Sequence, residues 1–346
     1  MPARDSPAAQ TPWVRESDDR LLDIRLCDLG VGIEGTALAA RIASLHDELA
    51  RAGLRFRPYI WLSTDWFTPD GHTGFAVPFY LAHPRLAHLE RRQMYAVEGG
   101  NHDDCMKLLR HETAHALDNA YRLHWRKRWR EHFGKASDPY RWSYVPDPES
   151  REHVLNIDHW YAQSHPVEDF AETFAVWLRP GERWRAQYAE WPAALKKLWF
   201  VDELMEEVGA KPARMRTRAR PDAIGKLKMT LREYYEEKKA FYGDVDRSVY
   251  DRELLQLFSN DPAFARRRAA AAVLREWRRE LRSRVANWTG QYPFVIDEVL
   301  QGMILRAREL NLRLYYSERE TVQDAAIVLT MHTMRHIRGT FREYHR

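Results

Sequence analysis

The stretch His111-Glu112-Thr113-Ala114-His115 constrains this chain more than any other part of the sequence. It lies in a run that contains neither Gly nor Pro up to Tyr121, and Asp103 and Asp104 stand at the start of that run. Acidic residues are favoured in the first turn of a helix, so we predict one helix here. Residues four apart on a helix share a face, and the two histidines can therefore present their imidazole rings to one ion.

Glu112 follows the first histidine directly, where its carboxylate can take a proton from a metal-bound water. The pattern His-Glu-x-x-His on a helix is typical of zinc sites. The chain has 15 histidines, so the motif alone leaves open a helix that carries two surface histidines.

A second predicted helix begins at Pro166, a residue that suits the first turn, and Ser164 or His165 can cap it. Glu168 and Glu172 are four apart on this helix and share a face. We predict that Glu168 is the third metal ligand. Glu172 can then accept the free N–H of a ligand imidazole and fix its tautomer.

These two motifs together resemble the gluzincin family of zinc metallopeptidases. The local likeness extends to the catalytic domain of anthrax lethal factor and to groups known only as zinc-binding metallopeptidases, and it covers roughly residues 100–180. In that domain a Tyr lies seven residues before the ligand Glu, and Tyr161 stands at this spacing here (168 − 161 = 7). Asp118 matches an Asp that follows the second His. The gap from His115 to Glu168 is longer than in thermolysin-type gluzincins, and whether the basic insert at 125–160 within it binds substrate stays open.

The resemblance implies that His111, His115 and Glu168 hold Zn²⁺ and leave one position for water. It also implies peptide-bond hydrolysis, in which Glu112 accepts the proton of that water and passes it to the leaving amine. The Tyr161 hydroxyl would help to stabilise the oxyanion.

Three of these roles have alternatives. Tyr161 could simply pack beside Trp160. Asp118 is expected to contact a ligand or to have a structural role, and direct contact with the ion is the other possibility. His165 is the nearest rival to Glu168 as a ligand and could instead help to bind the transition state.

The chain has 346 residues, which exceeds the usual size of one domain. We predict an α+β zincin-like metallopeptidase domain at residues 19–209, with a small mixed sheet and an active-site helix. An α-helical domain at residues 223–346 follows, so the protein is expected to be predominantly helical. Residues 1–18 are expected to form a disordered tail, and the basic, Pro-flanked segment 210–222 is expected to be a linker.

In the first domain, alternating apolar residues predict a strand at residues 22–27, and helical spacing predicts a helix at residues 38–49. Further strands are expected at residues 56–62 and 74–81, and Pro78 marks the latter as an edge strand. The backbone of such an edge can pair with an extended peptide substrate. A strand covered by a loop is the alternative.

In the C-terminal part, Ser317 and Glu320 form a capping box for the last helix. Apolar residues at helical spacing are expected to face the core there: Leu274, Trp277, Leu281, Val285 and Trp288.

The net charge is +4, from 54 basic and 50 acidic residues, and this near balance does not indicate nucleic acid or a membrane as a partner. No stretch approaches the roughly 20 apolar residues of a membrane span, and the first residues lack the apolar segment of a signal peptide. We therefore expect a cytoplasmic protein with a protein or peptide substrate. The partner of the helical domain is not indicated. The alternative function is a zincin-fold module that binds zinc or a partner without cleavage.

Overall fold

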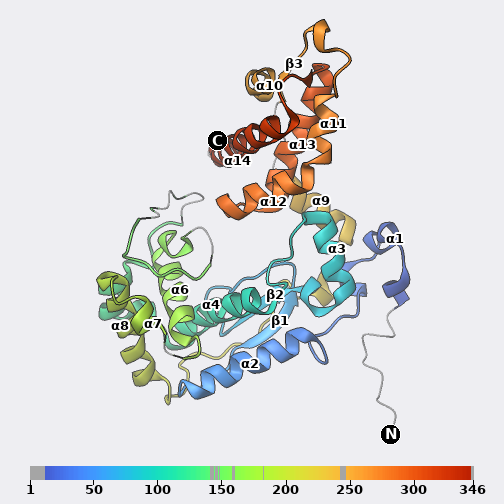
Figure 1. The fold of residues 1–346 in the computed structure, drawn as a ribbon. Helices are drawn as coiled ribbons and strands as arrows, with labels where there is room; N and C mark the ends of the chain where they lie inside the picture. The colour runs from blue at the N-terminus through green and yellow to red at the C-terminus, as the bar shows by residue number, and fades with distance from the viewer. Residues whose placement is uncertain are drawn as a thin grey trace. The chain divides into compact units, whose positions relative to one another are not determined.

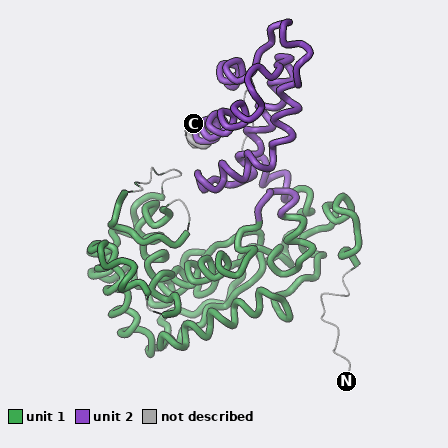
Figure 2. Tube along the Cα trace, viewed as in Figure 1, with its two compact units in different colours: residues 1–90, 97–233 green, residues 91–96, 234–346 purple. Residues whose placement is uncertain are grey.

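The structure is a computed structural model of the whole chain. It describes residues 12–140, 144, 147, 149–157, 160–181, 183–241 and 247–343, without the side chains of 241 and 336–343. The described residues are predominantly helical, as expected from the sequence. The chain forms two compact units (Figure 2). Unit 1 comprises residues 1–90 and 97–233, and unit 2 comprises residues 91–96 and 234–346.

Unit 1 is built around α4 (His102–Tyr121), which packs against α6 (Pro166–Leu178), α2 (Ala37–Arg51) and strand β2 (Gly74–Pro78) (Figure 1). Strand β1 (Tyr59–Ser63) pairs in parallel with β2, so that Tyr59 lies opposite Gly74. The other helices that lie in unit 1, or begin there, are α1 (Asp18–Leu22), α3 (Pro84–Met94), α5 (Lys127–Phe133), α7 (Trp184–Gln187), α8 (Pro192–Val208) and α9 (Leu231–Phe241).

The two helices that carry the sequence motifs begin at strong local signals. Asn101 precedes α4, and its side-chain oxygen accepts the backbone N–H of Asp104 at 2.9 Å. Arg122 ends this helix in the left-handed conformation, with φ of 54°. His165 caps α6 by accepting the N–H of Val167, and Pro166 occupies its first turn. Both predicted helices are confirmed.

The predicted strand at residues 22–27 is wrong. Ser17 caps α1, and two aspartates in its first turn favour the helix, which takes in Leu22. Within the predicted strand, Arg25 forms an isolated antiparallel bridge with Thr230, flanked by backbone hydrogen bonds to residues 227–231. A partner so distant in the chain leaves no local signal.

The expected disordered tail is also wrong for residues 12–18, because Pro12–Arg15 forms a 3₁₀ helix. Trp13 is buried there and donates its indole N–H to the carbonyl of Leu29 at 2.9 Å. Residues 1–11 lie outside the described residues.

Strand β2 ends earlier than predicted, at Pro78, because Phe79–Ala82 forms a 3₁₀ helix. The side of β2 that does not face β1 is covered at one point, where the N–H of Ala76 donates to the carbonyl of Phe67 at 2.9 Å. At this position the structure favours the covered strand over the free edge.

The segment 210–222 is not a free linker but is bound along unit 1. Side chains of β1 hold its backbone: the hydroxyl of Tyr59 donates to Ala219, the indole of Trp61 to Pro221, and the hydroxyl of Ser63 to Asp222. Polar, Pro-flanked composition fits an extended strap of this kind as well as a linker, and unit 1 continues to residue 233.

Unit 2 has its core between helices that pack against α13 (Pro293–Glu309). The other α-helices and strands described wholly within unit 2 are α10 (Asp251–Leu257), β3 (Phe258–Ser259), α11 (Ala270–Glu276), α12 (Arg278–Thr289), β4 (Arg313–Leu314) and α14 (Glu318–Glu343). The capping box is confirmed in one half: the Ser317 hydroxyl accepts the backbone N–H of Glu320 at 3.4 Å, whereas the Glu320 carboxylate accepts that hydroxyl instead of the backbone N–H that a complete box uses. Among the described helices, none is long and apolar enough to cross a membrane.

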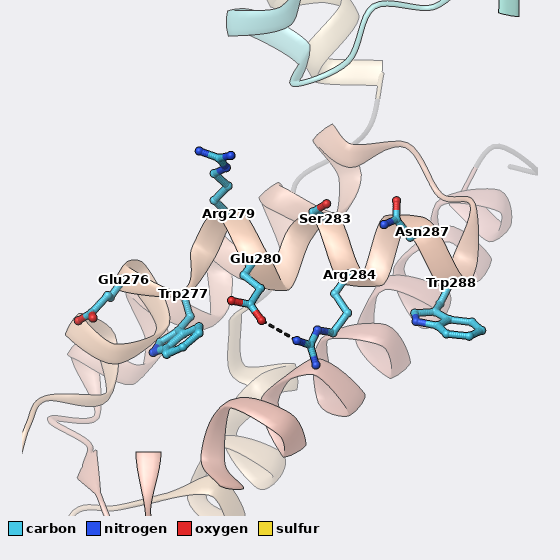
Figure 3. A pocket seen from close by; sticks show the side chains of 8 residues that line it. All are labelled: Glu276, Trp277, Arg279, Glu280, Ser283, Arg284, Asn287 and Trp288. Atoms are coloured by element: carbon cyan, nitrogen blue, oxygen red, sulfur yellow. Dashed lines mark hydrogen bonds and ion pairs between the residues drawn. The ribbon is translucent and has the colours of Figure 1, made fainter. Parts of the chain in front are cut away.

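The predicted apolar stripe of unit 2 is correct except at its end. Leu274, Leu281 and Val285 are buried and Trp277 packs against the core, but Trp288 is 88% exposed. Figure 3 shows Trp288 near one end of α12, among the side chains that line a pocket, and this pocket has a volume of about 670 Å³. Trp288 lies in the last turn of α12, which ends at Thr289 and is capped by Gly290.

Candidate metal centre

Three side chains from α4 and α6 converge at one point. The Nε2 atom of His111 lies 3.0 Å from Oε2 of Glu168, and the Nε2 atom of His115 lies 3.3 Å from the same oxygen. The two Nε2 atoms are 3.0 Å apart. Ligand atoms of a tetrahedral zinc ion at about 2.0–2.2 Å are separated by roughly 3.3 Å, so these atoms are spaced as such an ion requires. This buried group could hold a metal ion.

The chemistry of the three atoms also fits a cation. Oε2 of Glu168 is buried and accepts no hydrogen bond from the described residues, although both imidazoles are close to it. Burial would raise the pKa of Glu168, but His115 and His111 hold that pKa well below its usual range. Burial would lower the pKa of His111, yet the carboxylates of Glu168 and Glu172 raise it well above its usual value. The site therefore favours positive charge between its donors.

Glu172 orients one of the imidazoles. Its Oε1 atom lies 2.8 Å from Nδ1 of His111, which places the proton on Nδ1 and leaves Nε2 free to bind an ion. The carboxylate is fully buried and also accepts the side-chain amide of Asn156 at 2.9 Å and the backbone N–H of Ile157 at 2.7 Å. These bonds hold Glu172 as an acceptor in the place predicted for it.

Glu112 lies beside the group rather than within it. Its Oε2 atom accepts the hydroxyl of Thr68 at 2.7 Å. Asn119 fixes the loop that carries Thr68 to α4, since its amide donates to the carbonyls of Pro69 and His72. Burial raises the pKa of Glu112, against the opposing effect of the two histidines. A carboxylate with a raised pKa is suited to accept and release a proton near neutral pH.

Two tyrosines reach the site. The ring of Tyr161 lies 5.7 Å from the ring of His111, and its hydroxyl makes no hydrogen bond with the described residues. Tyr140 donates its hydroxyl to Oε1 of Glu168 at 2.6 Å. Tyr140 is not among the residues predicted from the sequence. It lies in the insert, 28 residues before its partner, and no motif or spacing marks it.

The structure places two of the predicted residues elsewhere. Asp118 accepts both the backbone N–H and the ring Nδ1–H of His124, each at 2.8 Å, so its carboxylate is directed to that histidine and not to a ligand imidazole. Both nitrogens of His165 are used within the protein: Nδ1 accepts from Val167, and Nε2 donates to the carbonyl of Asp138 at 2.7 Å. His165 is therefore not a third ligand.

The group opens into a cavity of about 690 Å³. The catalytic-site candidates Glu112 and Tyr161 line it together with aromatic side chains, among them Trp66, Phe67 and Trp125. Trp125 is 66% exposed, and the guanidinium of Arg122 lies 5.3 Å from the centre of its ring. The cavity size falls within the usual range of ligand sites, about 300–1,000 Å³.

Comparisons with known protein families, with curated proteins and with solved structures find no match to this chain.

Proposed function

We propose that this protein is a zinc-dependent metallopeptidase of the gluzincin type, with a zincin-like unit 1. The observation that carries the proposal is the convergence of His111, His115 and Glu168 on one point, with Glu112 beside them. Two imidazoles and one carboxylate form the ligand set of a catalytic zinc site that keeps a fourth position open.

Zinc at this group would supply a Lewis acid that lowers the pKa of a water molecule and polarises a carbonyl group. Glu112 is positioned by Thr68 to accept a proton from the attacking water and to deliver it to the leaving amine. Tyr161 has a hydroxyl with no partner among the described residues, which can donate to the oxyanion. Glu172 keeps the His111 ring in the orientation that ligation needs.

The cavity supports a peptide as the substrate. Its walls combine exposed aromatic surface at Trp125 with the polar groups of the site. Arg122 also lines the cavity and makes no ion pair with the described residues, so its guanidinium can meet a carboxylate of the substrate.

The alternative is a module that binds zinc or a partner without cleavage. The same three ligands would serve it, but it would have no use for Glu112. A buried carboxylate beside the ligands, hydrogen-bonded to Thr68 and with a raised pKa, favours the enzyme.

The test compares the zinc-loaded protein with its Glu112→Gln variant on an unstructured protein such as casein and on a peptide library. We expect cleavage by the wild type, and a loss of activity of at least about 100-fold in the variant with full zinc content. A wild type that holds zinc and cleaves nothing would favour the binding module. His111→Ala combined with His115→Ala should abolish zinc binding, and retention of one zinc per chain would refute the site.

A further inference from the structure

The two oxygens of Glu168 have different surroundings. Oε2 faces the Nε2 atoms of His111 and His115, whereas Oε1 accepts the hydroxyl of Tyr140 at 2.6 Å. A bond of this length to a charged acceptor is among the stronger hydrogen bonds in proteins. One oxygen is thus held by the protein, and the other is left for an ion.

Tyr140 is held in place by the end of the helix that carries Glu168. Its ring stacks on His165 with 3.9 Å between ring centres and 13° between planes. His165 is in turn fixed by Val167 on one nitrogen and by Asp138 on the other. Because His165 also caps α6, the tyrosine, its stacking partner and the ligand carboxylate form one connected group.

We infer that Tyr140 is a positioning residue for the third metal ligand, and that its hydroxyl makes Glu168 bind through one oxygen only. The inference rests on the proposed zinc site. Carboxylates bind metal ions through one or both oxygens, and a hydrogen bond to one of them decides between the two modes. The insert at 125–160 therefore contributes to the metal centre itself.

The second tyrosine has a different role. Tyr161 also lines the cavity, but its hydroxyl makes no hydrogen bond with Glu168 or with any other described residue. Loss of the Tyr140 hydroxyl should therefore weaken metal binding, and loss of the Tyr161 hydroxyl should not.

The test uses Tyr140→Phe in the full-length protein, a change that keeps the ring and its stacking on His165 and removes only the hydroxyl. Zinc affinity is measured by competition with a chelator, with Tyr161→Phe as the matched control. We expect affinity to fall about 10–100-fold in Tyr140→Phe, as for other groups that orient a ligand, and to stay at the wild-type value in the control.

The second readout is the visible absorption of the Co²⁺-substituted protein, which depends on coordination number. With both oxygens of Glu168 free, Tyr140→Phe should show the weaker absorption of a higher-coordinate ion. Circular dichroism of the metal-free variant should match the wild type.

Equal zinc affinity and an equal Co²⁺ spectrum in Tyr140→Phe and wild type would overturn the inference and leave the zinc site intact. A wild type that binds no zinc would overturn the proposed function as well.

Discussion

Glu168 and Glu172 lie one turn apart on α6, and the structure gives them different tasks that mutation can separate. Glu168 directs Oε2 to the point where His111 and His115 converge. Glu172 instead contacts the far nitrogen of His111 and the segment at Asn156. We predict that Glu168→Gln weakens zinc binding far more than Glu172→Gln does.

The size of each effect follows from the contacts. In Glu172→Gln, the amide fills the same space and its oxygen can still accept a hydrogen bond from His111. The loss of zinc affinity is therefore that expected when a group that orients a ligand is disturbed. Such changes cost about 10–100-fold in affinity, or roughly 1.4–2.7 kcal/mol. In Glu168→Gln, a charged ligand atom is lost from a set of three, and we expect a loss beyond about 100-fold.

Isothermal titration of the metal-free proteins with zinc, or competition with a chelator, measures both affinities. Unfolding of the metal-free variants shows whether the fold is kept. A larger loss in Glu172→Gln would show that the two carboxylates have been assigned to the wrong tasks. Small and equal losses would remove both from the metal site.

Two further predictions concern stability. In the zinc-free protein, burial would lower the pKa of His111, but the carboxylates of Glu168 and Glu172 outweigh burial and raise it well above 6.5. Protonated His111 therefore stabilises the folded state fully below pH 6.5, and this contribution is lost as pH rises through the folded-state pKa. Thermal unfolding in chelator should therefore show stability that falls as pH rises above 6.5, and a flat or rising profile would contradict this. In unit 2, Asp297 is fully buried and pairs with Arg278 and Arg282. Asp297→Ala should therefore lower the free energy of unfolding by about 3 kcal/mol. Loss of the exposed carboxylate of Glu280, which pairs with Arg284, should cost under about 1 kcal/mol. Denaturant unfolding measures both, and equal costs would refute the argument.

The parts of the fold and site that could be predicted are those that local signals determine. The position of α4 follows from the acidic residues in its first turn and from a run without Gly or Pro. The start of α6 follows from Pro166 and the side chain that caps the helix. Residues four apart on a helix share a face. The sequence spacing therefore predicts that His111 and His115 share one face of α4, and that Glu168 and Glu172 share one face of α6.

The parts that could not be predicted depend on contacts between distant segments. Tyr140 reaches Glu168 from a loop, where no periodicity relates a residue to its partner. The segment 210–222 binds to β1 through its carbonyl groups, which every residue type offers equally. The sequence places Asp118 on the same helix as His115. Its partner His124 lies beyond the end of α4, and only the turn after the helix brings the two residues together.

The most direct test of the proposed site is a crystal structure of the purified protein with anomalous scattering recorded on both sides of the zinc absorption edge. We expect one zinc ion per chain, bound by Nε2 of His111, Nε2 of His115 and one oxygen of Glu168, at about 2.0–2.2 Å. An ion held by other residues, or no anomalous peak between α4 and α6 in zinc-supplemented crystals, would contradict the proposed metal centre.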